Sequence, residues 1–361
     1  MRLAPAGALA VAALVLCSRL ASSQTLERRI DQYVQSLAGY PFSGVVLVAK
    51  RGNVVFEHAY GFADADLGVR NRVNFRFGIG SLSKPFTAVA AMRLVETGHL
   101  RLSDSICTYV RACPNAWRPV TLESLLSHTS GIPDLFSQVA AVPVDSMRGA
   151  VDAVVAKHQA DALQSEPGEK YAYSNFGYFL VAYAMEAATG RSWSSILRTE
   201  VFDRAGTRET EYDDVWRVMS NRVRGYATAD GSLRLINYHD HGAWAAGGLL
   251  SSAADLLRFD QAFESGRLVS DSSRRAMMTP RKGDYGLGWQ IITAFGQRLR
   301  NHTGGTNGYT AWLGHFDDGT AVIILSNIEE SPAKSIGCDV AALVFKLQPS
   351  RRGEMACRPA R

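Results

Sequence analysis

The sequence predicts an α/β protein of the α+β type, with one antiparallel sheet built from both ends of the chain. Two apolar segments with strand character lie near the N-terminal end, and three more lie in the last quarter of the 361 residues. Between them the apolar periodicity is mostly helical. This order indicates a sheet flanked by helices, with a mostly helical region inserted between its first and last strands.

The N-terminal part supplies one helix and a hairpin. Apolar side chains return every three or four residues between Leu26 and Leu37, which predicts a helix. The segments Val45–Ala49 and Val54–Tyr60 predict two strands, because a turn signal at Arg51-Gly52-Asn53 separates them.

The central part predicts several helices. One runs from Ser81 to Thr97 and is apolar nearly all round, so we expect it to be buried. A short helix starts at Thr121, and a longer one has its apolar face between Phe176 and Ala187. Ser252 and Asp255 have the spacing of a capping box, which predicts a helix running to Gly266.

The C-terminal part returns to strands. We expect strands at Gly286–Thr293, Tyr309–His315 and Thr320–Asn327, the last two joined by a turn at Asp317-Asp318-Gly319. A closing amphipathic helix follows between Ile336 and Leu347.

Composition indicates a protein with a sizeable core that does not bind nucleic acid. Hydrophobic residues make up 47% and charged residues 20% of the chain, which argues against disorder. The net charge is only +5, and the basic residues are scattered rather than clustered. No repeat or linker divides the chain, so we expect a single domain at 24–361 with its core at 30–347.

The first 23 residues have the pattern of a signal peptide. Arg2 precedes an almost wholly apolar run from Leu3 to Leu16, and small residues at Ala21-Ser22-Ser23 suit cleavage after Ser23. We therefore expect a periplasmic or secreted protein with no stable membrane span after cleavage. An uncleaved anchor and a lipid attachment at Cys17 are the alternatives.

Four cysteines remain in the expected mature chain: Cys107, Cys113, Cys338 and Cys357. An even number allows three pairings, and an oxidising compartment would preserve such bridges. We favour the pairs nearest in sequence, Cys107 with Cys113 and Cys338 with Cys357, although the sequence does not decide the pairing. No Cys-x-x-Cys spacing suggests metal binding.

The Ser81-Leu82-Ser83-Lys84 stretch holds the first candidate catalytic pair. Residues three apart share a helix face, so the Ser81 hydroxyl can meet the Lys84 amine. A serine needs a base beside it to act as a nucleophile, and a buried lysine with a lowered pKa can serve. The same spacing recurs at Ser331 and Lys334, where a solvated helix start explains it; only the first copy enters an apolar helix.

Two further stretches carry groups of the right chemistry. Tyr173 and Asn175 lie two apart before a helix and so point the same way in an extended segment. A core tyrosine with a helix-capping asparagine is the alternative. The run His302, Thr303, Gly304 and Gly305 predicts a strand edge on which a substrate can pair, and a glycine-rich loop is the alternative.

Together these motifs resemble the serine β-lactamase and penicillin-binding protein superfamily, closest to its branch of class C β-lactamases, D-alanyl-D-alanine carboxypeptidases and related esterases. The resemblance covers roughly Ile30 to Leu347, and its order and spacing are more specific than any one motif. The matching stretches are Phe77–Lys84, Leu125–Gly131, Tyr173–Tyr178, Ala246–Leu249 and Leu325–Asn327.

The resemblance implies a β-lactamase/transpeptidase-like fold and a role for each site residue. Ser81 is the nucleophile that is acylated, Lys84 its proton-accepting partner, Tyr173 an acid and base, and Asn175 a ligand of the substrate amide. Whether Lys84 or Tyr173 takes the first proton stays open. The backbone N–H groups of Ser81 and Gly305 are candidates to bind the substrate carbonyl oxygen as it becomes negative.

One departure bears on the substrate. Class C β-lactamases usually have lysine where this chain has His302. A histidine is about half charged near pH 6.5, so its hold on a substrate carboxylate should weaken from pH 6 to 8. This lowers the expectation of β-lactamase as the main activity.

The sequence therefore predicts an exported serine hydrolase that forms an acyl-Ser81 intermediate with esters, D-amino-acid peptides or related amides. A class C-like β-lactamase and a non-catalytic sensor or binder of cell-wall peptide or β-lactam are the alternatives. We expect no cofactor and no metal. His239-Asp240-His241 is the alternative metal site, but two histidines in a polar loop are more typical of surface residues. Gly-x-Ser-x-Gly is absent, which argues against an α/β-hydrolase. The expected partner is a small-molecule or peptidoglycan-like peptide substrate, and the expected state is a monomer.

Overall fold

The structure is a computed structural model that describes residues 25–37, 42–142, 146–214, 217–236, 243–349 and Cys357. The expected signal peptide, the His239-Asp240-His241 stretch and most of the C-terminal tail lie outside the described residues. Among the described residues, no helix has the length and apolar character needed to cross a membrane, and no cluster of three metal-binding side chains occurs.

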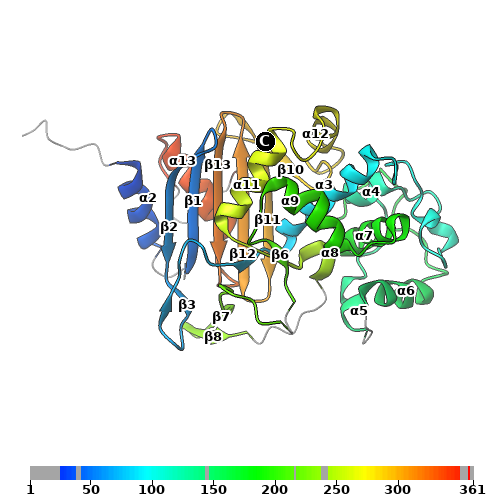
Figure 1. The fold of residues 1–361 in the computed structure, drawn as a ribbon, viewed down its shortest axis with the longest axis horizontal. Coiled ribbons are helices and arrows are strands. Elements are labelled where there is room, and N and C mark those ends of the chain that lie inside the picture. Colours follow the sequence, from blue (N-terminus) through cyan, green and yellow to red (C-terminus); the bar gives the residue numbers. More distant parts are fainter. Residues whose placement is uncertain are drawn as a thin grey trace, which may run out of the picture.

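A six-stranded antiparallel sheet forms the centre of the molecule (Figure 1). Its order is β10-β11-β12-β13-β1-β2, so strands from both ends of the chain form one sheet, as the sequence predicts. The N-terminal hairpin lies next to the last strand in this order. In this register Val46 of β1 faces Ile324 of β13 on one side and His58 of β2 on the other. The strands are β1 (Gly44–Lys50), β2 (Asn53–Tyr60), β10 (Gln290–Ala294), β11 (Gln297–Thr306), β12 (Tyr309–Phe316) and β13 (Thr320–Ser326).

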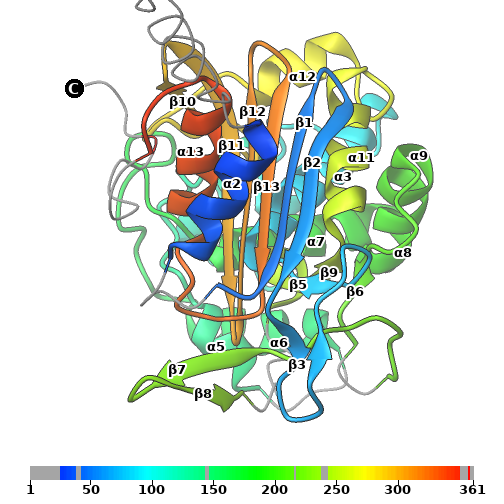
Figure 2. The ribbon, with the colours of Figure 1, turned by 90° about the vertical axis from the view of Figure 1, so that its left-hand side faces the viewer.

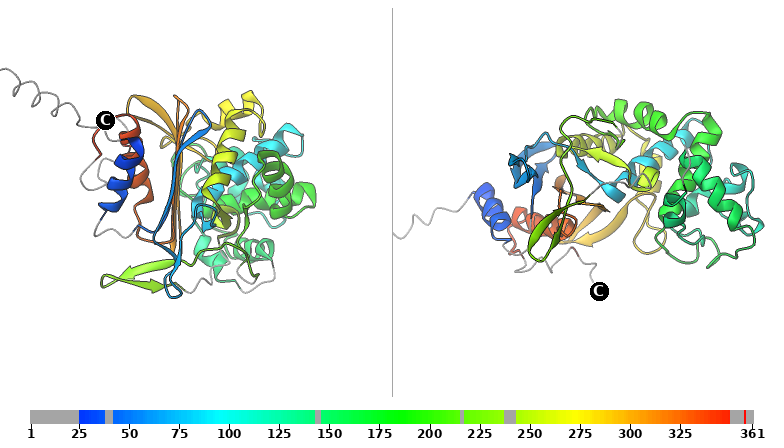
Figure 3. Two further views of the ribbon diagram at one scale, coloured as in Figure 1. Left: turned by 60° about the vertical axis from the view of Figure 1, so that its left-hand side comes forward. Right: turned by 90° about the horizontal axis from the view of Figure 1, so that it is seen from below.

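Alternation along the central strands gives the sheet two buried faces. Val45 and Leu47 of β1 belong to the larger core, whereas Val46 and Val48 belong to the smaller one. Successive side chains of a strand point to opposite faces, so a continuous apolar run is what a strand covered on both sides requires. Two helices, α2 (Leu26–Gln35) and α13 (Ala333–Val344), cover the smaller face (Figures 2 and 3).

The helix α13 packs closely on the sheet because of one glycine. A Cβ at Gly337 would lie 2.1 Å from the ring of Trp312 in β12, so only glycine permits this approach. Cys338 follows directly and forms a disulfide with Cys357, while Cys107 pairs with Cys113. Both favoured pairings are thereby confirmed.

The inserted helical region covers the other face of the sheet (Figure 1). At its centre lies α3 (Ser83–Glu96), which is buried almost all round, as expected, and packs against α7 (Asn175–Thr189). Gly190 ends α7 in the left-handed region, at φ +68°. The other helices are α4 (Leu122–Leu126), α5 (Phe136–Ala140), α6 (Met147–Lys157), α8 (Trp193–Leu197), α9 (Asp203–Ala205), α10 (Trp244–Gly247), α11 (Ala253–Glu264) and α12 (Asp271–Met277).

Short elements connect the two layers. A three-stranded sheet has the order β5-β9-β6, and two hairpins pair β3 with β4 and β7 with β8. Their bounds are β3 (Phe62–Asp64), β4 (Val69–Arg70), β5 (Phe77–Gly78), β6 (Glu211–Tyr212), β7 (Tyr226–Ala229), β8 (Ser232–Leu235) and β9 (Leu249–Ser251). Single turns of other helix types are η1 (Gly80–Leu82), η2 (Ile106–Thr108), η3 (Asn115–Trp117) and the π-helical η4 (Arg198–Phe202).

The structure corrects two element boundaries. The strand expected at Gly286–Thr293 begins only at Gln290, because the preceding glycine at 288 has φ +83°, a left-handed conformation that interrupts an extended strand. The expected Ser81–Thr97 helix is divided into a 3-10 turn and α3. Both differences lie beside the region where chemistry is expected.

A buried ion cluster joins β11 to α11 behind the sheet. Arg300 is 1% exposed and donates to Asp260 over 2.6 Å, and the His315 ring lies 2.8 Å from the same carboxylate. Burial by itself raises the pKa of Asp260, but His315 and Arg300 outweigh this effect and lower the pKa to about 2.

We predict that Asp260→Asn lowers the free energy of unfolding by about 3–5 kcal/mol at pH 7, because it removes the buried one of the two carboxylates that pair with Arg300 and leaves only Glu264, which is partly exposed. The folded-state pKa lies below the ordinary value of 3.8, so this stabilisation is complete above that value and is lost as the pH falls through about 2. Urea unfolding at pH 7 and pH 3 measures both effects. Asp230→Asn, at a carboxylate whose side chain is 92% exposed, is the matched control. Equal stability of the two variants would contradict the prediction.

Candidate active site

Ser81 lies on the 3-10 turn η1, where strand β5 passes into helix α3. Gly80 has φ +49°, and a Cβ there would lie 2.6 to 2.7 Å from backbone atoms of Gly305 in β11. Glycine is therefore required at position 80 both by its backbone conformation and by the close approach of β11. This approach brings the Ser81 turn against the strand on which the sequence predicts substrate binding.

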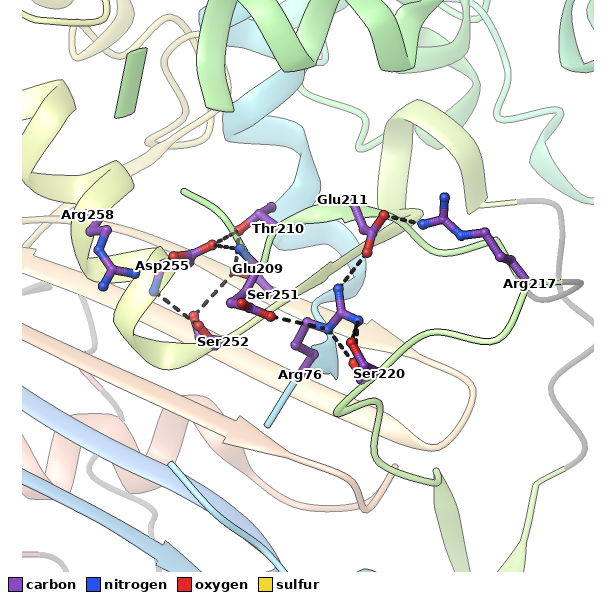
Figure 4. Close-up of polar contacts among 10 residues, drawn as sticks. All are labelled: Arg76, Glu209, Thr210, Glu211, Arg217, Ser220, Ser251, Ser252, Asp255 and Arg258. Carbon is purple, nitrogen blue, oxygen red and sulfur yellow. Dashed lines mark hydrogen bonds and ion pairs between the residues drawn. The ribbon is translucent and has the colours of Figure 1, made fainter. Parts of the chain in front are cut away.

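Ion pairs hold the small sheet from which Ser81 projects (Figure 4). Arg76, directly before β5, is buried, donates to the Ser220 carbonyl over 2.9 Å and pairs with Glu211 of β6 over 2.5 Å. On the far side of β9, the buried Asp255 carboxylate accepts a hydrogen bond from Thr210 over 3.0 Å. Both contacts hold β6 and the residue before it in place. Strand β6 belongs to the same small sheet as β5, and β5 leads into the Ser81 turn.

Lys84 is completely buried in the first turn of α3 and makes three contacts with oxygen atoms. Its Nζ lies 2.9 Å from Ser81 Oγ, 2.7 Å from Asn175 Oδ1 and 2.8 Å from the Ala246 carbonyl. Burial lowers its pKa well below the usual 10.5, and the charge of Asp134 opposes that effect. The structure therefore brings together three groups that the sequence singled out, on η1, α3 and α7.

These contacts define the direction of proton transfer. A neutral amine has two N–H groups and one lone pair. The carbonyl oxygens of Asn175 and Ala246 can only accept hydrogen bonds, so they take both N–H groups. The lone pair is then left for the hydroxyl proton of Ser81, which is the arrangement that an activated serine nucleophile needs.

Tyr173 lies over the same amine. Its ring centre is 4.7 Å from Lys84 Nζ, and its hydroxyl interacts with Ser81. Desolvation raises the pKa of this phenol, and the hydrogen bond with Ser81 opposes the rise. The residue as a whole is 39% exposed, so the ring borders solvent although its hydroxyl points toward the serine. A phenol in this place can exchange protons with both Ser81 and an incoming substrate.

The edge of β11 beside Ser81 is open. Strand β10 pairs with β11 from Gln297 only to Asn301, so the described strands leave the outer edge unpaired from His302 onward. Thr303 and Gly305 are exposed on this stretch, whereas His302 and Gly304 are buried. A Cβ at Gly304 would lie 1.8 Å from the Ile79 carbonyl, so a glycine is needed where β11 passes the Ser81 turn.

A cleft of about 320 Å³ contains the site. It opens at Ser81 and Asn175 and runs along the end of β11. Its lining residues are Ser81, Phe136, Asn175, Ala243, Ala246, Gly247, Gly305, Thr306, Asn307 and Glu329. A larger cavity of about 610 Å³ lies away from Ser81, between β3 and the β7–β8 hairpin. We assign the chemistry to the smaller cleft because it alone of the two holds Ser81.

His302 differs from its expected role. It is 4% exposed, and its Nε2 lies 2.8 Å from the Tyr285 hydroxyl while its Nδ1 lies 2.6 Å from the Thr303 carbonyl. A carbonyl only accepts, so Nδ1 carries the proton and Nε2 accepts from Tyr285. Burial and the charge of Lys84 lower the pKa of His302 to about 3. The half-charged imidazole expected near pH 6.5 therefore does not fit this structure, in which the ring is neutral and buried. The substrate-binding role of His302 stays a prediction.

Sequence reasoning missed three contributors to the site. The Ala246 carbonyl is a backbone group, which no side-chain motif can reveal. Asp134 and His128 contact the Tyr173–Asn175 segment. His128 belongs to the Leu125–Gly131 stretch that resembles the family, and Asp134 follows that stretch closely, which is the signal that the sequence offers for both. At the second serine-lysine spacing, Lys334 donates to Gln290, so this copy does not repeat the first.

The beta-lactamase family model matches residues 26–344 of the chain. Penicillin-binding protein 4* of Bacillus subtilis (strain 168) is 32% identical over 316 residues, which are 81% of this chain and 69% of that protein. The protein belongs to the beta-lactamase family. A D-aminopeptidase of Brucella anthropi is 27% identical over 308 residues, which are 79% of this chain but only 56% of that protein.

Solved structures of the superfamily share the fold. The octameric penicillin-binding protein homologue from Pyrococcus abyssi has a TM-score of 0.79 at 25% identity, over 90% of this chain and 78% of that one. D-amino acid amidase from Ochrobactrum anthropi SV3 has a TM-score of 0.72 at 23% identity, over 84% and 92%. The expected β-lactamase/transpeptidase-like fold is confirmed. The expected monomer stays a prediction, and one similar protein is an octamer.

We predict that the His302 ring stays neutral between pH 5 and pH 8, because its pKa is lowered to about 3. The affinity for anionic substrates should then show no step from this residue between pH 6 and 8. NMR of histidine-labelled protein measures the ring directly, with His302→Gln to assign its signals. A titration with a midpoint near 6.5 would restore the anion-binding role.

Proposed function

We propose that this member of the beta-lactamase family is an exported serine hydrolase that forms an acyl-Ser81 intermediate with esters, D-amino-acid peptides or related amides. The observation that supports this most directly is the contact of 2.9 Å between Ser81 Oγ and a buried lysine whose two N–H groups have carbonyl partners. The two disulfides suit an oxidising compartment and so support export.

Acylation follows from this geometry. The Lys84 amine takes the hydroxyl proton while Ser81 Oγ bonds to the substrate carbonyl carbon, and the carbonyl oxygen becomes negative. The backbone N–H groups of Ser81 and Gly305 stabilise that oxygen. Tyr173, close to both Ser81 and Lys84, passes a proton to the leaving alcohol or amine as the bond to the acyl carbon breaks and the carbonyl forms again. Lys84 returns the proton it took from Ser81 to Tyr173, so both groups end neutral.

Deacylation reverses these roles. A water molecule gives its proton to the Tyr173–Lys84 pair and attacks the acyl carbon, and Ser81 Oγ leaves with a proton returned by the pair. Asn175 holds the substrate amide on the acyl side, and the open edge of β11 at Thr303 and Gly305 pairs with its backbone.

The family leaves one alternative that a specific observation favours. The relative that is 32% identical is named a penicillin-binding protein, so this chain can react with β-lactams, either with turnover as in a class C-like β-lactamase or without it as a sensor. The neutral His302 argues for substrates without a carboxylate at that position, which favours esters and amides.

Labelling of Ser81 tests the proposed function. We predict that a fluorophosphonate probe modifies Ser81, and that Ser81→Ala abolishes both labelling and hydrolysis. The purified mature protein is assayed in parallel on a short-chain aryl ester, a chromogenic cephalosporin and a D-Ala-D-Ala peptide. We expect ester hydrolysis and little or no cephalosporin turnover. Stoichiometric labelling without turnover of any substrate would favour the sensor, and an unlabelled Ser81 would refute the proposal.

The role of Lys84 as a base gives a second prediction. Lys84→Arg replaces the neutral amine by a permanent cation that cannot act as a base, so kcat/KM should fall by about 10²–10⁴-fold. In the unchanged enzyme the acid limb of kcat/KM should lie well below pH 10.5, because activity requires the deprotonated amine and its pKa is lowered. An arginine variant with near-normal kcat/KM would assign the base to Tyr173 alone.

A further inference from the structure

The loop His128–Asp134, which we call the holding loop, runs beside the segment that carries Tyr173 and Asn175. The Ala172 N–H donates to the His128 carbonyl over 2.8 Å, and the Gly168 N–H donates to the Thr129 carbonyl over 2.8 Å. The two segments are thus joined by backbone hydrogen bonds just before Tyr173. Residues at both ends of the holding loop then contact the catalytic segment with their side chains.

His128, at the first end, contacts the backbone and the ring of the tyrosine segment. Its Nδ1 accepts the Ser174 N–H over 3.1 Å, and its ring centre lies 4.2 Å from that of Tyr173. Together with the carbonyl contact to Ala172, these interactions fix the residues on both sides of Tyr173. His128 itself has φ +58° and is 1% exposed, so the fold imposes a left-handed conformation to place this ring.

The contact requires a neutral imidazole. Burial and the nearby Lys84 lower the pKa of His128 well below 6.5, so Nδ1 keeps the lone pair that accepts the Ser174 N–H. The proton then belongs to Nε2, which is buried and has no hydrogen-bond partner among the described residues. A group left unsatisfied in the interior costs free energy, which argues that His128 is kept for its contacts with the tyrosine segment rather than for stability.

Asp134, at the other end, fixes the orientation of the Asn175 amide. One carboxylate oxygen accepts the Phe176 N–H over 2.9 Å, and the other accepts Asn175 Nδ2 over 3.3 Å. A carboxylate can only accept, so it holds the NH₂ end of the amide. The carbonyl end of Asn175 is thereby turned to Lys84 at 2.7 Å, where it takes one of the amine's N–H groups.

We propose that the holding loop is a positioning element in which His128 fixes Tyr173 and Asp134 fixes the Asn175 amide, so that the Lys84 lone pair faces Ser81. The proposal rests on the proposed function, because it assigns roles in the same acyl transfer. Neither residue touches the reacting atoms. Without Asp134, the Asn175 amide is free to turn its NH₂ toward Lys84 and remove an acceptor. Without an acceptor at position 128, the Tyr173 backbone loses one of its two flanking hydrogen bonds.

The role of Asp134 can be tested through the pH dependence of activity, because its charge affects the pKa of Lys84. The rings of Tyr173 and Tyr178 face the amine. The neutral side chains of His128 and His302 are its electrostatic neighbours. Asp134 is the carboxylate whose charge raises the pKa of Lys84 against the effect of burial. Removing that charge must therefore move the protonation of Lys84 to lower pH.

The first experiment compares Asp134→Asn with Asp161→Asn, the same charge change at an exposed residue that pairs with His158. We expect Asp134→Asn to lower kcat by about tenfold, as loss of a charged hydrogen-bond partner does. We also expect Asp134→Asn to move the acid limb of the pH profile of kcat/KM to lower pH. Asp161→Asn should leave both kcat and the position of that limb unchanged. An unmoved limb in Asp134→Asn overturns the role of Asp134, because a purely structural loss would change the rate without shifting the limb.

The second experiment compares His128→Asn with His128→Ala. Asparagine tolerates a positive φ and offers Oδ1 in the place of Nδ1, so it restores the acceptor for Ser174. We expect His128→Asn to keep kcat within about threefold. We expect His128→Ala to lower kcat by about 100-fold, with KM much less changed, because a displaced catalytic group costs that much.

In the second experiment, kcat is compared only between variants that are folded, and thermal unfolding shows whether each variant is folded. Equal kcat for the two variants overturns the role of His128, and so does a folded His128→Asn that has lost most of its activity. If His128→Ala does not fold, the asparagine result decides alone. Labelling of Ser81 by the fluorophosphonate in the unchanged enzyme separates these failures from failure of the proposed function, which would leave all variants and the parent unlabelled.

Discussion

The site depends on one constraint, the complete burial of the Lys84 amine. A buried ammonium is costly without a paired charge, and the described residues place only carbonyl and hydroxyl oxygens within hydrogen-bond distance of Nζ. The neutral form is therefore favoured, and it is the form that can take a proton from Ser81. Helices α3, α7 and α10 pack against one another, and this packing buries the amine and supplies its acceptors.

The sheet contributes the second half of the site through close backbone approach. Gly80 and Gly304 let the Ser81 turn and β11 pass at distances that a side chain would forbid. Strand β11 ends its pairing with β10 at Asn301, so the described strands leave its outer edge beside Ser81 unpaired. The same strand carries Arg300 into the ion cluster with Asp260, which ties the substrate-binding edge to α11.

Much of the fold and of the site could be predicted from local patterns. The continuous apolar run of β1, the buried character of α3 and the capping serine at Ser252 each follow from a rule that acts within a few residues, and the structure contains all three. His302 shows where such rules stop. Its pKa depends on burial and on the neighbouring Lys84, and neither is visible in the run His-Thr-Gly-Gly.

The sequence by itself determined the family, the building of one sheet from strands at both ends of the chain and the residue types in the site, because periodicity and motif spacing are local properties. The order of the strands in that sheet came from the structure. Tertiary structure alone decided the protonation of Lys84 and His302, the orientation of the Asn175 amide and the part played by His128 and Asp134. Burial and hydrogen-bond partners set each of these. The partners of Lys84, Asn175 and the Tyr173 segment come from about 40 to more than 160 residues away in the chain, and Tyr285, the side-chain partner of His302, lies on a neighbouring segment.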